Sequence, residues 1–396
     1  MLIAEDRERP IWPTPWSVGA AKYNMPAGAY RFLLALIVFF SHTRFNVFDF
    51  TNASTGFVAV ICFFVVSGFI IARVLDTVYV GHVWHFVINR MLRIYPVMWA
   101  ATIISLAAIA VHGNFTMWPA TISGWTLDDA IRSFSLIAAF PYRVWKVVPP
   151  GWTIHIEACF YVAIVIGYAA VGRLSERSKS SAIRSYCLIW LAIYLMISCA
   201  TNLRFENAAG FIPFFVLGVA IHRLTFGLSS RAEWMVFGFA FALSLNSILH
   251  WNNVENLSIF TPWTDIQPWF ATVRIPGNLV WFTIMLAVFV ALLYVNIPVK
   301  LRRIDGFLGD LTYPMYATHF IVCAVTGDGF MLERPALITM IQLVACLIVA
   351  YLFNRCIERP LYPLRDAFRG KGKAFSGLLP SYDITAPTRI QSRLSF

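Results

Sequence analysis

The chain has 396 residues, of which 59% are apolar and only 13% are charged, and its mean hydropathy is +0.68. So few charged side chains cannot cover the surface of a soluble protein of this length, so the composition excludes a soluble globular enzyme. The net charge of +11 would suit nucleic-acid binding, but no nucleic-acid-binding motif accompanies it. We therefore expect a polytopic membrane protein.

Apolar stretches long enough to cross a bilayer recur along the whole chain. We predict an all-α transmembrane helix bundle of about ten spans, at residues 30–49, 56–75, 94–112, 152–172, 183–201, 208–226, 233–251, 277–298, 306–326 and 336–354. Segment 129–148 is apolar only in part and carries Arg132, Arg143 and Lys146, so we expect an interfacial or re-entrant helix on the outer side. A crossing there would reverse every later orientation.

Basic residues gather on one side of this ten-span topology. Most of the 31 Lys and Arg residues fall in the N-terminal segment, in alternate loops and in the C-terminal tail. By the positive-inside rule both termini are cytoplasmic. The predicted organisation is a cytoplasmic N-terminal segment (1–29), a transmembrane domain (30–360) and a flexible cytoplasmic tail (361–396), without a cleavable signal peptide.

Arg31 and His42 lie eleven residues apart in the first span and on one helical stripe. Eleven residues are about three turns, which separates the two side chains by roughly 16 Å along the axis. Arg31 alone could be an anchor that snorkels to the interface, and His42 alone could bond to a neighbouring helix. Two costly polar groups on one stripe favour a functional site, with Arg31 near the cytoplasm and His42 towards the outer face.

Two further motifs supply charged partners for this stripe. Arg90 and Arg93 are spaced i and i+3 at the start of the third span, and their two guanidinium forks suit a phosphate or pyrophosphate. Positive-inside anchoring is the simpler explanation of either arginine alone. Glu157 lies inside the fourth span, where an unpaired carboxylate is costly. We expect it to bond to His42 and to raise the basicity of that imidazole.

The ninth span carries Tyr313, Tyr316 and His319 at spacings of three, so the three side chains share a face and can line a polar cavity. Ser67, in a small-residue patch of the second span, and Trp152, beside Glu157, complete the substrate-pocket candidates. The seven cysteines are scattered and indicate packing rather than disulfides or zinc ligands, and we expect no metal. Tryptophans and acidic residues in the loop after residue 251 suit sugar binding, but an interfacial aromatic belt is the favoured explanation of these tryptophans.

Six motifs occur in order between residues 31 and 360, namely Arg31-x10-His42, FFVVSGF, RMLRIYPVMW, GWTIHIEACFY, LGDLTYPMYATH and the closing ERP. Together they resemble acyltransferase family 3, the bacterial membrane O-acyltransferases that modify surface and secreted glycans. The resemblance implies a multi-pass protein of the bacterial cytoplasmic (inner) membrane. It also implies an acyl-CoA cosubstrate, usually acetyl-CoA, and an acceptor hydroxyl on an exopolysaccharide, a lipopolysaccharide or a lipid-linked sugar. By motif match, Arg31 and His42 correspond to the essential first-helix pair, and Arg90 and Arg93 to the paired arginines.

The mechanism that we predict holds the phosphates of coenzyme A with Arg31, Arg90 and Arg93 while the thioester reaches His42. His42, supported by Glu157, would deprotonate the acceptor hydroxyl, or would itself form a transient acyl-imidazole. A proton-coupled transporter or flippase of an anionic or sugar-linked solute would use the same residues, and a non-catalytic member of a polysaccharide assembly complex is a third alternative. The sequence also leaves open whether the protein forms a homo-oligomer.

Overall fold

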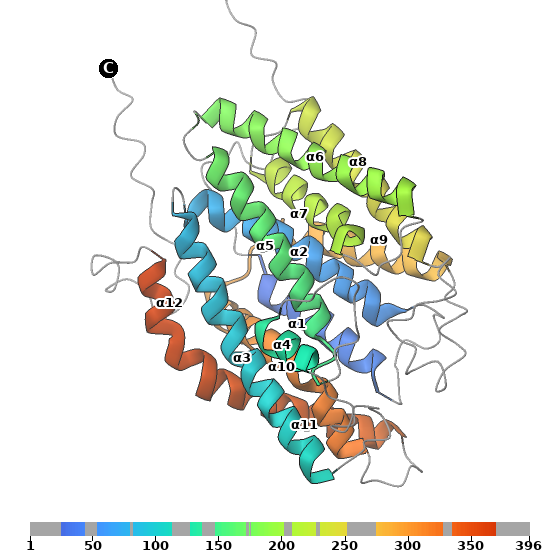
Figure 1. Cartoon of the computed structure of the whole chain (residues 1–396), viewed down its shortest axis with the longest axis vertical. Helices are drawn as coiled ribbons and strands as arrows, with labels where there is room; N and C mark the ends of the chain where they lie inside the picture. Colours follow the sequence, from blue (N-terminus) through green and yellow to red (C-terminus); the bar gives the residue numbers. More distant parts are fainter. Residues whose placement is uncertain are drawn as a thin grey trace, which may run out of the picture.

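The computed structural model describes residues 25–43, 54–79, 82–112, 127–136, 147–171, 174, 176–201, 208–226, 230–251, 275–327 and 335–369. Within these ranges the chain forms helices and no strands (Figure 1). The principal helices are α1 (Ala27–Ser41), α2 (Thr55–Thr77), α3 (Val83–His112), α4 (Leu127–Ser135), α5 (Gly151–Val171), α6 (Glu176–Thr201), α7 (Ile212–Thr225), α8 (Arg231–Trp251), α9 (Ile275–Leu292), α10 (Val299–Gly327), α11 (Pro335–Phe353) and α12 (Tyr362–Phe368). The predicted all-α class is confirmed.

Each of the predicted spans coincides with one helix. Seven helical segments are long and apolar enough to cross a membrane, and they comprise α2, α3, α5, α6, the segment that ends in α7, α8, and α11 with its continuation into α12. Helices α1 and α9 are apolar but shorter, and α10 carries charged residues in its first turns. The chain is therefore a multi-pass membrane protein, while ten crossings and cytoplasmic termini stay predictions.

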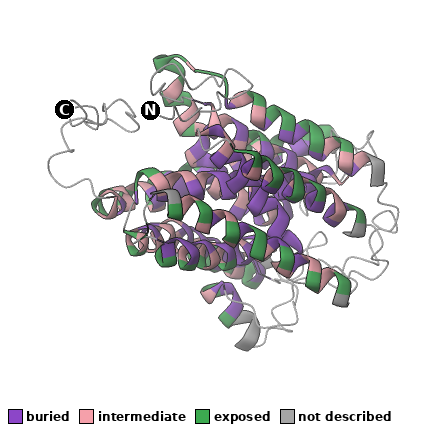
Figure 2. Cartoon of the chain, turned by 90° about the horizontal axis from the view of Figure 1, so that it is seen from above, coloured by how far each residue is buried: buried purple, intermediate pink, exposed green. Residues whose placement is uncertain are grey.

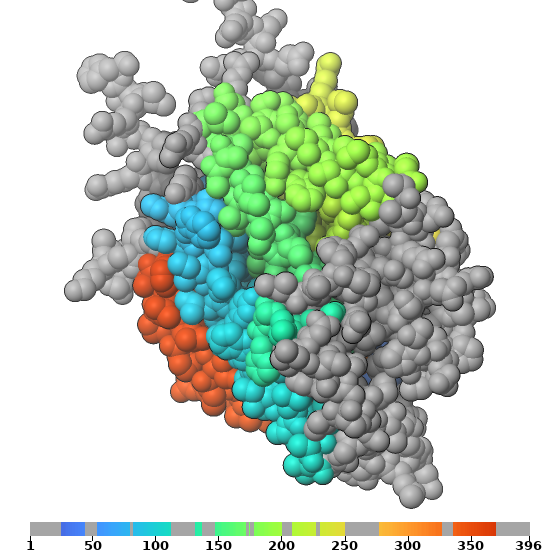
Figure 3. All heavy atoms as spheres, in the orientation of Figure 1, coloured from blue at the N-terminus to red at the C-terminus, as the bar shows by residue number. Residues whose placement is uncertain are grey.

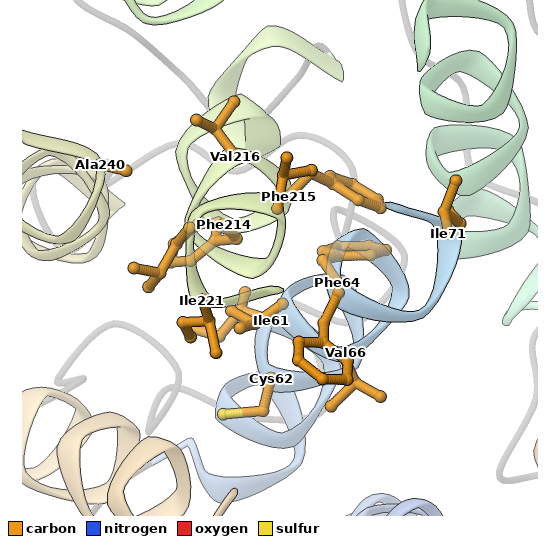
Figure 4. Packing of buried hydrophobic residues seen from close by; sticks show 14 of the residues in the cluster. Ile61, Cys62, Phe64, Val66, Ile71, Phe214, Phe215, Val216, Ile221 and Ala240 are labelled. Carbon is orange, nitrogen blue, oxygen red and sulfur yellow. The ribbon is translucent and has the colours of Figure 1, made fainter. Parts of the chain in front are cut away.

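The centre of the bundle is the contact between α2 and α7, the two candidate spans with the largest buried share, 72% and 78%. Gly68 and Gly218 make the contact close, because an added Cβ would lie 2.2 Å and 1.9 Å from backbone oxygens of the facing helix. Small residues let membrane helices approach in this way. Around the crossing, Phe64 and Phe215 stack with ring centroids 4.9 Å apart (Figure 4).

A second close contact joins α1 to α10, two helices that run parallel. An added Cβ on Gly28 would lie 1.8 Å from the Asp305 carbonyl oxygen. The Asp305 carboxylate accepts a hydrogen bond from the Ala29 backbone N–H at 2.7 Å, which satisfies one of the free donors in the first turn of α1. One turn further along α10, Gly309 lies against Gly28 and the Arg31 guanidinium. The register of the two helices is therefore fixed at their first turns.

The outward faces of the peripheral helices are apolar and exposed, as lipid contact requires (Figure 2). Only 22% of the α6 span is buried, and exposed apolar side chains include Ile189 and Met196 on α6, Ile166 on α5 and Met235 on α8. Two charged side chains in this region, Arg223 and Glu233, are buried and paired with each other. The Arg223 guanidinium donates to both carboxylate oxygens of Glu233, at 2.9 and 2.6 Å.

Two connecting segments bear on the expected topology. Helix α4 has nine residues and rises about 13 Å, too little to cross a bilayer, and it is tied to α3 by hydrogen bonds from Tyr95 and Trp99. Helical structure continues past residue 361, where we expected the tail to begin. A π-helical turn (Asn354–Glu358) and a 3-10 turn continue α11 into α12, which packs on α3 through residue 368. Residues 370–396 lie outside the described part, as do 1–24.

The glycine contact in the central crossing gives a testable difference. Gly218→Ala forces a methyl group against the Val65 carbonyl oxygen, and we expect a loss of about 1–3 kcal/mol of stability. Gly238→Ala on α8 is the matched control, because nothing lies within 4 Å of its added Cβ. Alanine is the better helix former by up to about 1 kcal/mol, so this variant should be as stable as the parent or more so. Thermal unfolding in detergent measures both, and equal melting temperatures would contradict the packing argument.

Candidate functional site

One cavity lies between α1, α2, α3, α5 and α10, and the space free of protein atoms in the cavity and its open mouth together is about 850 Å³. Its wall combines apolar side chains of α2 with polar side chains of the other helices. The polar lining residues are Arg31, Ser67, Arg90, Arg93, Thr153, Glu157, Tyr161, Thr312, Tyr313 and Tyr316. Five of the six sequence motifs, which come from distant parts of the chain, contribute residues to the lining of this cavity.

The cavity is elongated along the helices. On α2 its lining extends from Val60 to Ile71, and eleven residues of helix rise about 16 Å. At one end, Thr153 and Tyr316 share a hydrogen bond of 2.8 Å. At the other end, Arg90 lies over the Tyr161 ring, 5.6 Å from its centroid. The cavity thus has a hydroxyl end and an arginine end.

Glu157 lies in the middle of the cavity wall and accepts two hydrogen bonds. The Ser67 hydroxyl donates to its carboxylate at 2.8 Å, across from α2. The Tyr161 hydroxyl, one turn along α5, donates to the same oxygen. The carboxylate therefore connects two helices and stands beside the arginine end, where it offsets part of the positive charge.

Three arginines from two helices form the arginine end. The Arg90 guanidinium lies 5.1 Å from the centroid of the Phe86 ring, so aromatic faces on two sides hold it. Arg93 faces the cavity one turn later on α3. Arg31 enters from α1, where its Nε donates to the Ala27 carbonyl at 3.3 Å. Guanidinium groups at such an end match the geometry of phosphate oxygens.

A pair of histidines, His42 and His319, lies beside the hydroxyl end but outside the cavity lining. The His319 Nδ1 lies 2.7 Å from the Tyr316 carbonyl oxygen, so this nitrogen carries the proton and donates. Its Nε2 is buried without a hydrogen-bond partner among the described residues. The His42 ring stacks on His319 with centroids 5.5 Å apart. His42 is the residue that ends α1, and its side chain is exposed.

The expected hydrogen bond between His42 and Glu157 is not formed in the described structure. Glu157 is bonded to Ser67 and Tyr161, whereas the neighbours of His42 are the rings of His319 and Phe320. The two side chains lie at different depths in the bundle, because Glu157 lies two turns inside α5 and His42 lies at the very end of α1.

Of the other candidates, Tyr313 and Tyr316 line the cavity as expected, but Trp152 does not. Its ring packs against Phe57 and Phe211, at 6.5 and 5.8 Å between centroids. Sequence reasoning missed Tyr161 and Thr153, although both stand four residues from Glu157 on the same helix face and within the same motif. That spacing was the signal that could have found them.

No group of three or more His, Cys, Asp or Glu side chains that could hold a metal ion occurs among the residues that the structure describes. The aromatic and acidic outer loop, a candidate for sugar contact, falls on residues 252–274, outside the described ranges.

The chain is similar to known proteins over most of its length. The profile of acyltransferase family 3, described as an acyltransferase domain, matches residues 29–355. The chain is also 28% identical over 312 residues to the exopolysaccharide production protein ExoZ of Rhizobium meliloti (strain 1021), across 77% of this chain and 89% of that protein. No solved structure gives a significant match.

The two hydrogen bonds to Glu157 predict a graded effect of its replacement. Glu157→Leu leaves the Ser67 and Tyr161 hydroxyls without their acceptor and Arg90 without its nearby countercharge, so we expect a loss of about 1–3 kcal/mol. Glu157→Gln keeps a carbonyl acceptor and should lose less. Thermal unfolding of the two purified variants checks the order, and a leucine variant as stable as the glutamine variant would refute it.

Proposed function

Because this chain belongs to acyltransferase family 3, we propose that it transfers an acetyl group from cytoplasmic acetyl-CoA to a hydroxyl of an exopolysaccharide or its lipid-linked precursor. Membership makes it a multi-pass O-acyltransferase of the bacterial inner membrane. The exopolysaccharide acceptor rests on the similarity to ExoZ, whose name assigns it to exopolysaccharide production. The observation that carries the proposal is the elongated cavity, which has arginines at one end and at the other end Tyr316, the neighbour of the His42–His319 pair.

The donor fits the cavity by length and by charge. The pyrophosphate would be held by Arg90, Arg93 and Arg31, which enter from the side that the positive-inside rule makes cytoplasmic. The extended pantetheine arm would follow the apolar wall of α2 for about 16 Å. Its thioester would then arrive beside Tyr316. The Tyr316 hydroxyl donates to Thr153, which itself donates to the Pro150 carbonyl, and the Tyr316 proton would have to turn from Thr153 towards a carbonyl oxygen that gains charge.

His42 would carry out the proton transfer. In our proposal its imidazole takes the proton of the acceptor hydroxyl, whose oxygen attacks the thioester carbonyl and expels the coenzyme A thiolate, which receives that proton. Formation of an acyl-imidazole on His42, followed by attack of the acceptor, gives the same products. His319 would orient His42 by ring stacking and act as a positioning residue. Glu157 would position Tyr161 and Arg90 at the donor, in place of the support of His42 that we expected.

Replacement of His42 tests the chemistry. We expect His42→Ala to lose transfer of radiolabelled acetyl from acetyl-CoA to the polysaccharide by at least about 100-fold, the usual contribution of a general base. The control is His82→Ala, which removes an exposed imidazole outside the cavity and should leave the rate unchanged. Melting temperatures of both variants should match the parent. A fully active His42→Ala protein would overturn the catalytic assignment.

Replacement of Arg93 tests the donor end. Arg93→Gln removes a charge-assisted contact to phosphate worth about 1.5–3 kcal/mol, so we expect the KM for acetyl-CoA to rise by about tenfold or more. Because the acceptor does not use this contact, its KM should stay within about twofold. Arg231→Gln, an exposed arginine on α8, is the control and should leave both constants unchanged. An equal rise in both KM values would argue against a donor-specific role.

A further inference from the structure

The helix that follows the last span is held beside the arginine end of the cavity. Figure 3 shows the surface of α12 continuous with the first half of α3. The Asn89 side-chain amide on α3 donates to the Arg365 carbonyl oxygen at 2.7 Å, and the rings of His85 and Phe368 meet at 5.8 Å. These contacts give the side chains of α12 a fixed position relative to Arg90 and Arg93.

Arg365 is buried, and one nitrogen of its guanidinium lacks a hydrogen-bond partner among the described residues. Its side chain is 6% exposed, and its Nε is buried and has no partner. Within the described residues its interactions are the Tyr362 ring, 5.4 Å from the guanidinium carbon, and nearby charges. Arg223, which is equally buried, donates instead to Glu233 and to the carbonyl and hydroxyl oxygens of Ser180. Unsatisfied donors on a buried charge indicate a site for an anion.

Other arginines lie close to the Arg365 guanidinium. Arg365 experiences the charges of Arg93 and Arg369, both repulsive. Burial raises the pKa of the Tyr79 phenol, and the positive charges of Arg369, Arg90 and Arg365 oppose that rise, so guanidiniums of α3 and α12 face one phenol. Positive charges that lie close together repel one another and destabilise the fold unless an anion lies between them.

The nearby carboxylates do not satisfy Arg365. Glu358 is close enough to attract it but accepts its hydrogen bond from the Asn354 amide, at 2.9 Å. Asp366 accepts from Arg369 at 2.9 Å. Asp310 faces Tyr362 and Glu358. The Arg365 guanidinium is left with donors to offer.

We propose that Arg365 and Arg369 bind a phosphate monoester, and, resting on the proposed function, that this group is the 3′-phosphate on the ribose of coenzyme A. The order of groups supports this choice. Measured from the thioester, the 3′-phosphate of coenzyme A lies beyond the pyrophosphate. In the protein, the α12 arginines lie beyond Arg90 and Arg93, outside the cavity lining. A doubly charged phosphate with three acceptor oxygens can satisfy several guanidinium donors at once.

The experiment compares coenzyme A with dephospho-coenzyme A, which lacks only the 3′-phosphate. Binding to the full-length protein in phosphatidylcholine nanodiscs is measured by titration calorimetry. We expect the parent to bind coenzyme A at least about tenfold more tightly, and Arg365→Gln and Arg369→Gln to bind both compounds alike. Arg365→Gln keeps the bond from Asn89, which is made to the backbone. Arg355→Gln, exposed on the preceding π-helical turn, is the control and should keep the preference.

The outcomes separate the two proposals. If both α12 variants still prefer coenzyme A, the phosphate site is refuted while the acetyl-CoA function stands. If the parent binds neither compound, the function fails. Titration with inorganic phosphate then decides the site, which stands if Arg365→Gln abolishes this binding and falls if it does not. Selective binding of phosphatidylglycerol that depends on Arg365, without a preference for coenzyme A, would assign the arginines to a lipid headgroup and overturn the donor site.

Discussion

The close parallel contact between α1 and α10 is the constraint on which the site depends. Gly28 and Gly309 bring the two backbones together, and the Asp305 carboxylate caps the first turn of α1. Both helices then rise by the same amount per residue, so positions ten or eleven residues further on meet again. Arg31 therefore lies against Gly309, and His42 stacks on His319. The close contact at Gly28 and Gly309 thus sets the positions of both Arg31 and His42 along α1. Neither side chain could shift along the helix axis without the other.

Much of this could be predicted from the sequence because membrane helices carry their own signature. Length and apolarity located the helix that corresponds to each predicted span, and helical spacing placed Tyr313, Tyr316 and His319 on one face. Whether Glu157 bonds to His42 could not be predicted in this way, and the expected bond is not formed in the described structure. Spacing fixes which residues share a face of one helix, whereas the depth at which two helices meet depends on contacts such as that of Ser67 with Glu157. Helix α12 was missed for a related reason, since seven residues give too little periodicity to distinguish a packed helix from a tail.

The buried charges of this protein fall into two kinds. Arg223 and Glu233 satisfy each other completely and join α7, α8 and α6, because Arg223 also donates to Ser180. Such a pair fixes the register of neighbouring helices but offers nothing to a ligand. Arg365 on α12 lies over the Tyr362 ring, and its buried Nε has no hydrogen-bond partner among the described residues. The first kind connects the bundle, and the second keeps part of its bonding capacity for a molecule that arrives later.

The shortness of α1 has a consequence for the acceptor. Its 15 residues rise about 22 Å, less than the roughly 30 Å of hydrocarbon in a typical bilayer. The Tyr30 hydroxyl ties it to α9, another short apolar helix, through the Met285 carbonyl oxygen. Two short neighbours create a hydrophobic mismatch, which lipids relieve by local thinning. A thinned bilayer would lower the water boundary towards His42, so a hydrated sugar could meet the acyl group without entering the hydrocarbon.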